Sequence, residues 1–261
     1  QQSRLNAIYY GQFPEEFGPI RSTRPYFVDL TREYKGIFLA HGWSPEARDY
    51  LMSDVVPYIN AMNSSLDFYR VSDKEGPHDS YIKWSEVKGA IKEEGWWKNK
   101  KKIRAFKFLG EGEESIGEGA IKIMVDYGAS ECDYVYDAEK NVYLRYIDGE
   151  PYVDHETGKQ IAVSNVLVQR VNSYVYDSKG RLSIDMCEGG KARLFTNGKV
   201  VKGTWSREDL DSRTIFTDAE GNQFKLSPGH TWVEVADQNC DIDYDATPAP
   251  AEEASEEAET T

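Results

Sequence analysis

The first hundred residues alternate short apolar runs with amphipathic stretches that begin at helix-capping residues. Residues 5–10 form an apolar run with the length of a buried strand. Ser22 and Thr23 precede Pro25, and Pro is favoured at the first helical position, so a helix is predicted over residues 25–34. Further strands are predicted at 36–40 and 66–71, and further helices at 44–56 and 85–94. This alternation indicates an α/β domain with a short mixed sheet.

From residue 104 onward the pattern changes to short strands separated by turn residues. The dipeptide Asn197-Gly198 predicts a two-residue hairpin, because a type I′ turn needs positive φ at both central positions. Strands at this spacing, without a long helix, indicate a mostly antiparallel β domain. The predicted strands cover residues 120–127, 134–136, 142–147, 166–171, 182–186, 193–196, 199–204, 215–216, 224–226 and 231–235, of which the last is expected to end the sheet.

Charge adds a third segment to this picture. The 261-residue chain has a formal net charge of −14, and eight of the excess negative charges follow Gln238 with no basic residue among them. A stretch of this composition cannot bury a core and is expected to be disordered. We therefore predict an α+β protein: an α/β domain at 1–97, an antiparallel β domain at 104–237 and a disordered acidic tail at 238–261.

Composition also narrows the possible ligands. The lysine-rich stretch at residues 98–104 is short and is interpreted as a solvated connector, so nucleic acid is not an expected partner. Cys132, Cys187 and Cys240 are far apart and match no metal-binding spacing. No metal site and no cofactor is predicted. No apolar run approaches the length of a membrane span.

Arginines beside the first predicted helix suggest an anion site. Arg21 and Arg24 precede its N-terminus, where the helix dipole disfavours cations and backbone N–H groups favour an anion. Arg70 ends the predicted strand 66–71, and His78 lies in the loop that follows it. We predict that Arg21, Arg24, Arg70 and His78 bind a phosphate or carboxylate. The alternative is an internal network in which the arginines pair with Asp29, Glu33, Asp67 or Asp73.

Aromatic residues of the second half permit a second interpretation. Tyr143, Trp205 and Trp232 could line a sugar- or peptide-binding face. The alternative is that they fill the core of the β domain, which is typical of alternating aromatic residues in strands.

Several short motifs occur in a fixed order along the chain: GPIRSTRPYF at 18–27, HGWSPEA at 41–47, FYR at 68–70, PH at 77–78, GEP at 149–151, NGK at 197–199, GTW at 203–205 and PGHTW at 228–232. In these motifs the chain resembles the YerB-like putative lipoprotein family, a bacterial domain of unknown function numbered 3048. The resemblance covers nearly all of the predicted ordered chain and implies an extracytoplasmic protein with a lipid anchor outside this chain. It implies no established reaction.

Two functional hypotheses follow. The first is a non-catalytic cell-envelope module, which binds an envelope protein or glycopolymer and carries the arginine-lined anion site. It would reach the membrane only through its lipid anchor. The second is a phosphoryl or glycosyl-phosphate transferase, in which Arg21, Arg24 and Arg70 stabilise the charge of a diphosphate. It is suggested by a similarity in layout to LytR-type glycopolymer transferases, which is analogy only.

Overall fold

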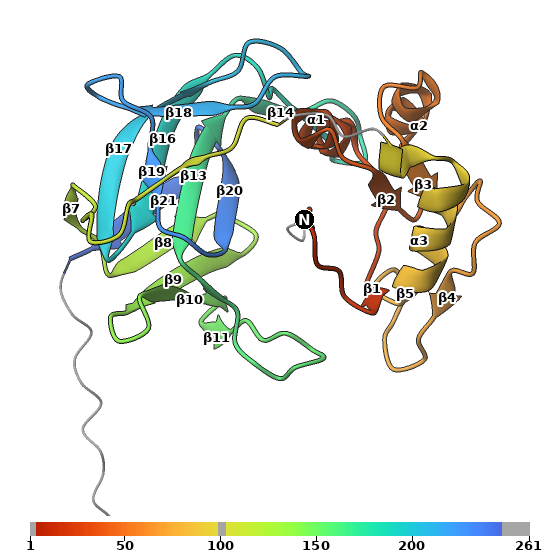
Figure 1. Ribbon diagram of the computed structural model, residues 1–261, viewed down its shortest axis with the longest axis horizontal. Helices are drawn as coiled ribbons and strands as arrows, with labels where there is room; N and C mark the ends of the chain where they lie inside the picture. The colour runs from red at the N-terminus through yellow and green to blue at the C-terminus, as the bar shows by residue number, and fades with distance from the viewer. Residues whose placement is uncertain (1–3, 99–102, 247–261) are drawn as a thin grey trace, which may run out of the picture.

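Two lobes lie side by side in the computed structural model, which describes residues 4–98 and 103–246 (Figure 1). The first lobe contains the three α-helices of the described chain, and the second lobe is built from strands. The fold class is therefore α+β, as the sequence predicts. The first lobe ends with the 3-10 helix η1 (Trp96–Lys98).

The strands of the first lobe form two groups. In one group two strands pair antiparallel with a shared third strand, and in the other group two strands pair in parallel. Extended residues 20–23 lie between these groups, because the N–H of Ile20 donates to the carbonyl of Ser80 (2.8 Å) and that of Thr23 to the carbonyl of Gly42 (2.9 Å). This segment leads directly into the first helix. The strands are β1 (Glu16–Phe17), β2 (Phe38–Ala40), β3 (Tyr58–Asn60), β4 (Tyr69–Arg70) and β5 (Ser80–Lys83).

The three helices are α1 (Pro25–Tyr34), α2 (Pro45–Met52) and α3 (Trp84–Glu93). α1 begins at the predicted Pro25 and α2 follows the predicted cap Ser44, while α3 begins one residue before the predicted position 85. The hydroxyl of Ser44 accepts a hydrogen bond from the N–H of Ala47, which caps α2. α2 ends before the predicted residue 56, yet Val56 still packs in the core beside Val28 of α1.

The predicted buried strand at residues 5–10 is wrong. Leu5, Ile8 and Tyr10 are 52%, 53% and 95% exposed, and the segment belongs to no strand. The position between the two groups of strands is occupied instead by residues 20–23, which bond to Ser80 on one side and to Gly42 on the other. Residues 4–10 run between the two lobes (Figure 1). An apolar run therefore did not become a strand, because apolar composition alone does not decide which segment pairs with a sheet.

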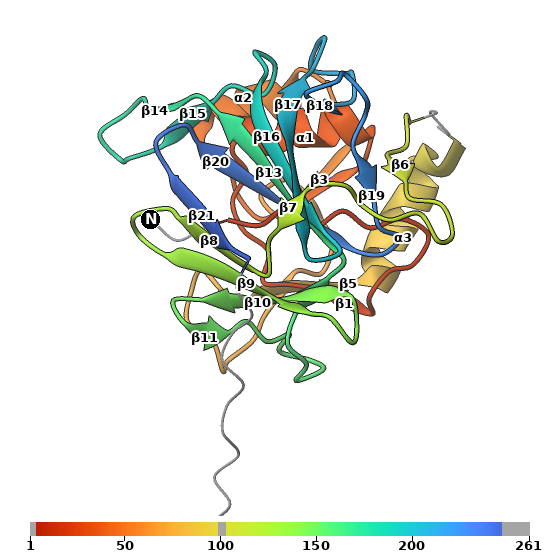
Figure 2. The ribbon, with the colours of Figure 1, turned by 90° about the vertical axis from the view of Figure 1, so that its left-hand side faces the viewer.

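The second lobe consists mainly of two six-stranded sheets that share a core (Figure 2). One has the order β11-β10-β9-β8-β21 with β12 on β10, and the other β18-β17-β16-β13-β20 with β7 on β17. Their pairs are antiparallel except β13 with β20. Ile123 and Tyr134 of the first sheet pack with Val166 and Phe195 of the second. The strands are β7 (Glu118–Gly119), β8 (Lys122–Asp126), β9 (Glu131–Asp137), β10 (Val142–Ile147), β11 (Glu150–Pro151), β12 (Ala162–Val163), β13 (Asn165–Val171), β16 (Gly190–Thr196), β17 (Lys199–Ser206), β18 (Ile215–Asp218), β20 (Thr231–Asp237) and β21 (Asp241–Asp245).

Two short strand pairs complete this lobe. The hairpin of β14 (Ser173–Val175) and β15 (Leu182–Ile184) projects toward the first lobe and contacts α1. β6 (Lys107–Phe108) and β19 (Lys225–Leu226) pair in parallel.

Part of the predicted acidic tail is a strand. β21 pairs antiparallel with β8, with Ile242 opposite Val125. Ile242 and Tyr244 pack against the core, while Asp241, Asp243 and Asp245 are exposed. The carboxylates of residues 241–245 led to the prediction of a disordered tail, although apolar residues alternate with them at the period of a strand. The strand at 231–235 is therefore not the last. The remainder of the predicted tail, residues 247–261, lies outside the described residues.

The predicted hairpin at Asn197-Gly198 is confirmed and supports a stability prediction. Both residues have positive φ, 51° and 67°, and a Cβ on Gly198 would lie 2.7 Å from the ring of Tyr136. We expect Gly198→Ala to lower the free energy of unfolding by about 1–3 kcal/mol, measured by denaturant titration. Gly128→Ala is the matched control, since Gly128 has φ 76° and nothing within 4 Å of the added Cβ. Equal losses in the two variants would show that the Tyr136 contact is unimportant.

Candidate anion-binding site

The N-terminus of α1 carries a cation where a carboxylate is the usual residue. Arg24 is the N-cap, and its side chain makes no capping hydrogen bond. No acidic residue lies in the first turn of α1. The Arg24 guanidinium donates through Nη1 to the carbonyl of Thr23 at 2.8 Å. The predicted conflict between this arginine and the helix dipole is therefore present in the structure.

A third arginine, Arg4, lies between Arg21 and Arg24. Its Nη1 donates to the carbonyl of Ser22 at 2.7 Å, and Ser22 lies between Arg21 and Arg24 in the sequence. Burial lowers the pKa of the Arg4 guanidinium, and Arg21 lowers it further. Burial likewise lowers the pKa of Arg24, and Arg4 adds to this effect. The three guanidinium groups are thus close enough to repel one another.

Arg4 was not among the predicted site residues, because the neighbouring residues were predicted to form a buried strand. Nothing local marks Arg4 as a ligand residue. It reaches the helix terminus only because residues 4–10 pass between the lobes. Sequence reasoning would have needed this path of the chain to select it.

Within residues 4–98 and 103–246, none of Arg4, Arg21 and Arg24 forms an ion pair with a carboxylate. Two of the acids named as alternative partners are engaged by other groups. Asp29 accepts a hydrogen bond from the hydroxyl of Tyr50 at 2.8 Å. Glu33 pairs with Arg213 of the second lobe, at 2.6 Å.

Arg70 does not join the other arginines as a free cation. It forms an ion pair with Asp79 at 2.5 Å, and the hydrogen bond from Arg70 lowers the pKa of the Asp79 carboxyl. The alternative of an internal network therefore holds for Arg70, with Asp79 in place of the acids considered. This pairing is a consequence of β4 and β5 lying side by side, which places residue 70 opposite residue 80.

His78 lies beside Arg21, as its inclusion in the site requires. The Arg21 Nη1 is 3.0 Å from Nε2 and 3.1 Å from Nδ1 of the imidazole ring. The loop between β4 and β5 therefore supplies a polar ring at one end of the arginine group. Both ring nitrogens face the same Arg21 nitrogen, and the one without a proton can accept its hydrogen bond.

The second lobe contributes groups at the other end. The β14–β15 hairpin docks on α2 through the hydroxyl of Tyr176, which donates to Glu46 at 3.0 Å. Arg181 follows in the same hairpin, and its Nη1 donates to Asp177 at 2.9 Å. Arg181 also lowers the pKa of Arg24, after the larger effect of burial. Arg181 is therefore a neighbour of Arg24 that is already paired with a carboxylate of its own hairpin, as Arg70 is paired with Asp79.

The aromatic residues proposed as a binding face do not form one. Tyr143 and Trp205 are buried, and each donates a hydrogen bond to a backbone carbonyl of the core, from the Tyr143 hydroxyl to Ala120 and from the Trp205 indole N–H to Arg170. Trp232 is partly buried and faces the guanidinium of Arg145 at 4.2 Å from its ring centroid. Tyr143 and Trp205 are therefore core residues, as the alternative interpretation predicts.

Arg145 is a second feature that the sequence analysis missed. Its side chain is 1% exposed and lies 3.8 Å from the carboxylate of Glu234. The hydroxyls of Tyr127 and Tyr134 both donate to this carboxylate. Burial raises the pKa of Tyr134 well above its ordinary value, and Glu234 adds to the shift. The signal was present in strand 142–147, because alternation places Arg145 on the same face as Tyr143.

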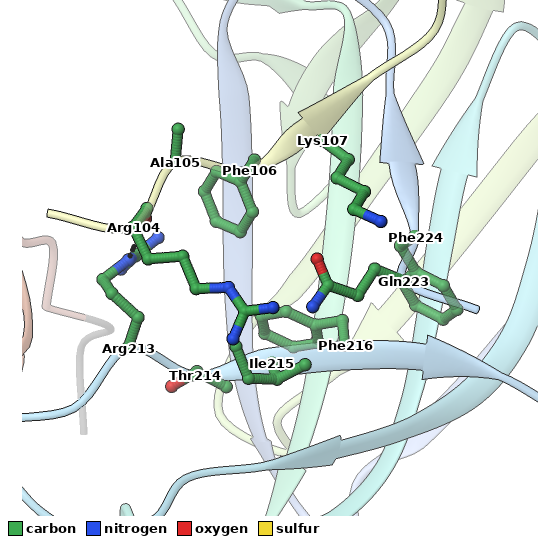
Figure 3. A pocket seen from close by; sticks show the side chains of 10 residues that line it. All are labelled: Arg104, Ala105, Phe106, Lys107, Arg213, Thr214, Ile215, Phe216, Gln223 and Phe224. Carbon is green, nitrogen blue, oxygen red and sulfur yellow. Dashed lines mark hydrogen bonds between the residues drawn. The ribbon is translucent and has the colours of Figure 1, made fainter. Parts of the chain in front are cut away.

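Two hollows lie elsewhere, near the C-terminal end of α1. A cleft of about 480 Å³ is lined by Lys35, Arg104, Asp211 and their neighbours. Beside it is a cavity of about 20 Å³, which has room for one water molecule. Figure 3 shows the rings of Phe216 and Phe224 behind Gln223, with the side chain of Arg104 extending toward it. None of the predicted site residues lines either hollow.

The described residues contain neither a metal-binding group of side chains nor a membrane-spanning helix. Across residues 4–98 and 103–246, no three His, Cys, Asp or Glu side chains are grouped so that they could hold a metal ion. In the same residues no helix has the length and apolarity needed to cross a membrane.

Comparisons with known proteins match most of the chain. Two family models fit: the N-terminal domain of the protein of unknown function DUF3048 at residues 1–97, and its C-terminal domain at residues 123–233. The sequence is 34% identical over 241 residues to Putative lipoprotein YerB of Bacillus subtilis (strain 168), covering 90% of this chain and 71% of that protein. The crystal structure of YerB protein from Bacillus subtilis matches with a TM-score of 0.79 and 32% identity, over 91% of this chain and 80% of that one.

Proposed function

Because the chain belongs to the DUF3048 family, which includes a protein named as a lipoprotein, we propose that it is an extracytoplasmic envelope protein held at the membrane by a lipid anchor. We further propose that it is a binding module, whose partner is an envelope molecule that carries phosphate groups. The phosphate binds at Arg4, Arg21 and Arg24, beside the N-terminus of α1.

The observation that carries this proposal is the grouping of these three arginines without a carboxylate partner among the described residues. Neighbouring guanidinium groups repel one another, and partial burial strengthens the repulsion by lowering the effective dielectric constant. An anion between them removes this cost. Guanidinium also presents paired N–H donors that match the oxygens of a phosphate group. The positive end of the α1 dipole adds to the attraction.

The transferase hypothesis gains no comparable support. It needs Arg70 beside the other arginines as a free cation, whereas Arg70 is engaged by Asp79. We therefore propose binding and no reaction.

Replacing Arg24 by Gln is expected to weaken the binding of pyrophosphate by about tenfold or more, because one charge-assisted hydrogen bond contributes about 1.5–3 kcal/mol. Isothermal titration calorimetry at low ionic strength measures this change. Arg48→Gln is the matched control, since Arg48 is an exposed arginine of α2 whose guanidinium contacts only the adjacent Asp49 in the described structure. Wild-type protein that fails to bind pyrophosphate, or an Arg24→Gln variant that binds it as tightly as wild type, contradicts the proposal.

A further inference from the structure

The cleft near the C-terminal end of α1 is lined by both lobes and contains two cations without a carboxylate partner. Lys35, the C-cap of α1, lines it from the first lobe, and Arg104 lines it from the segment that enters the second. Both residues are exposed, and neither forms an ion pair within residues 4–98 and 103–246. The cleft volume of about 480 Å³ lies within the range of small-molecule sites, about 300–1,000 Å³. The cleft is therefore large enough for a small ligand, and its free cations favour an anion.

Buried residues that line the cleft add an excess of positive charge. Arg207 and Arg213 both pair with the single carboxylate of Glu33, at 3.4 and 2.6 Å. One glutamate neutralises only one of these two arginines. In addition, the Nη1 of Arg207 is buried and makes no hydrogen bond among the described residues. A positive charge in surroundings of low dielectric constant attracts an anion more strongly than the same charge in water.

The two acidic residues that line the cleft do not cancel this excess. Asp211 is engaged by Arg32 at 2.6 Å, which compensates its charge. Glu208 is exposed to solvent, where salt screens its repulsion of an anion. Cations therefore outnumber carboxylates along the cleft, whereas the chain as a whole has a formal net charge of −14. The cleft differs in sign from the average of the molecule.

We propose that this cleft binds a small organic anion with an apolar portion. The anionic group contacts Arg104 and Lys35, and the apolar portion contacts Ile103 and Ile215, which also line the cleft. This site is independent of the phosphate site proposed above, which lies at the opposite end of α1. The ends of this ten-residue helix are about 15 Å apart. Because both lobes supply lining residues, the bound ligand also bridges the lobes.

Arg104 carries more of this inference than Lys35. A cation at the C-terminus of a helix is stabilised by the helix dipole, so Lys35 has a reason for its position without a ligand. Arg104 belongs to no helix or strand. Its carbonyl accepts a hydrogen bond from the Nε of Arg213 at 3.3 Å, which holds its main chain beside the buried arginines. Arg104, Arg213 and Ile215 line both the cleft and the small cavity beside it (Figure 3). Replacing Arg104 is therefore the most direct test.

The test measures the binding of two fluorescent dyes to the full chain: anilinonaphthalene sulfonate, which is apolar with one negative charge, and phenylnaphthylamine, its uncharged analogue. We expect wild-type protein to bind the sulfonate at one saturable site, and Arg104→Gln to weaken that binding by about fivefold or more, because a charge-assisted contact is lost. Lys35→Gln should cause a smaller loss. Neither substitution should change the binding of the uncharged dye. Arg48→Gln is the matched control, since Arg48 is exposed and does not line the cleft.

A second variant tests the volume of the cleft rather than its charge. Ser206 is an exposed residue at the end of β17 that lines the cleft. Ser206→Phe places a bulky ring there and should weaken the binding of both dyes by about tenfold or more. A partly unfolded variant exposes apolar surface and binds more of the sulfonate dye, so a loss of binding cannot come from misfolding.

Three results would overturn the proposal. They are a wild-type protein without saturable sulfonate binding, an Arg104→Gln variant that binds the sulfonate as tightly as wild type, and an equal loss in Arg48→Gln. Pyrophosphate separates the two proposed sites: Arg104→Gln should bind it like wild type, and Arg24→Gln should bind the sulfonate like wild type. If Arg24→Gln weakens sulfonate binding and Arg104→Gln does not, the dye occupies the phosphate site and the cleft is excluded.

Discussion

Replacing Glu33 by Gln is expected to lower the free energy of unfolding by about 3–5 kcal/mol, because it leaves buried cations without their counter-ion. Glu33 is 3% exposed and lies at the end of α1. Its carboxylate is 2.6 Å from Arg213 and 3.4 Å from Arg207, and it accepts a hydrogen bond from the N–H of Thr214 at 3.1 Å. Both arginine side chains are almost completely buried. No other carboxylate contacts either of them in the described structure.

This loss of stability should arise at the contact between the lobes, since Glu33 belongs to the first lobe and both arginines belong to the second. Denaturant titration followed by tryptophan fluorescence measures it. Glu93→Gln is the matched control, since Glu93 is exposed at the end of α3, and its effect should stay within about 0.5 kcal/mol. A loss below about 1 kcal/mol in Glu33→Gln would show that the glutamate contributes little to this joint.

Replacing Arg145 by Met is also expected to lower the free energy of unfolding by about 3–5 kcal/mol. The guanidinium is enclosed by the rings of Trp232 and Tyr152, at 4.2 and 4.6 Å from their centroids, and it neutralises the buried Glu234. Met fills a similar volume but leaves the carboxylate without a cation. Cation–π contacts with both rings are lost at the same time. Chemical denaturation of the variant measures the effect.

A double variant separates charge from packing at this position. Glu234→Gln removes the charge and keeps one oxygen that can accept from one of the hydroxyls of Tyr127 and Tyr134, while its NH2 group can donate to the other. We expect Arg145→Met combined with Glu234→Gln to be at least about 1 kcal/mol more stable than Arg145→Met alone. Losses that simply add would mean that the two charged groups do not stabilise one another.

The elements that were predicted correctly depend on residues close together in the chain. α1 begins at Pro25 and α2 is capped by Ser44, because capping needs only the next few backbone groups. The Asn197-Gly198 turn likewise depends on the φ angles of two residues. These local signals were sufficient for the helices, the main hairpin and the α+β class.

The errors all concern neighbours that are distant in the chain. Residues 5–10 had the composition of a strand but pair with no sheet, whereas β21 had the charge of a tail and pairs with β8. Tyr143 and Trp205 were considered for a surface because alternation shows which residues share a face and not what covers that face. Arg70 was placed in the anion site because Asp79 becomes its partner only when β4 and β5 pair.

The fold class, the starts of α1 and α2, the positions of Arg21 and Arg24 before α1, and the family that the motifs indicate all follow from the sequence alone. Which cations pair with carboxylates depends on the tertiary structure. It pairs Arg70 with Asp79, brings Arg4 to the start of α1, and encloses Arg145 with Glu234. The physical reason is range: dihedral preferences and capping act within a few residues, whereas a charge is neutralised by whichever group the folded chain places within a few ångströms of it.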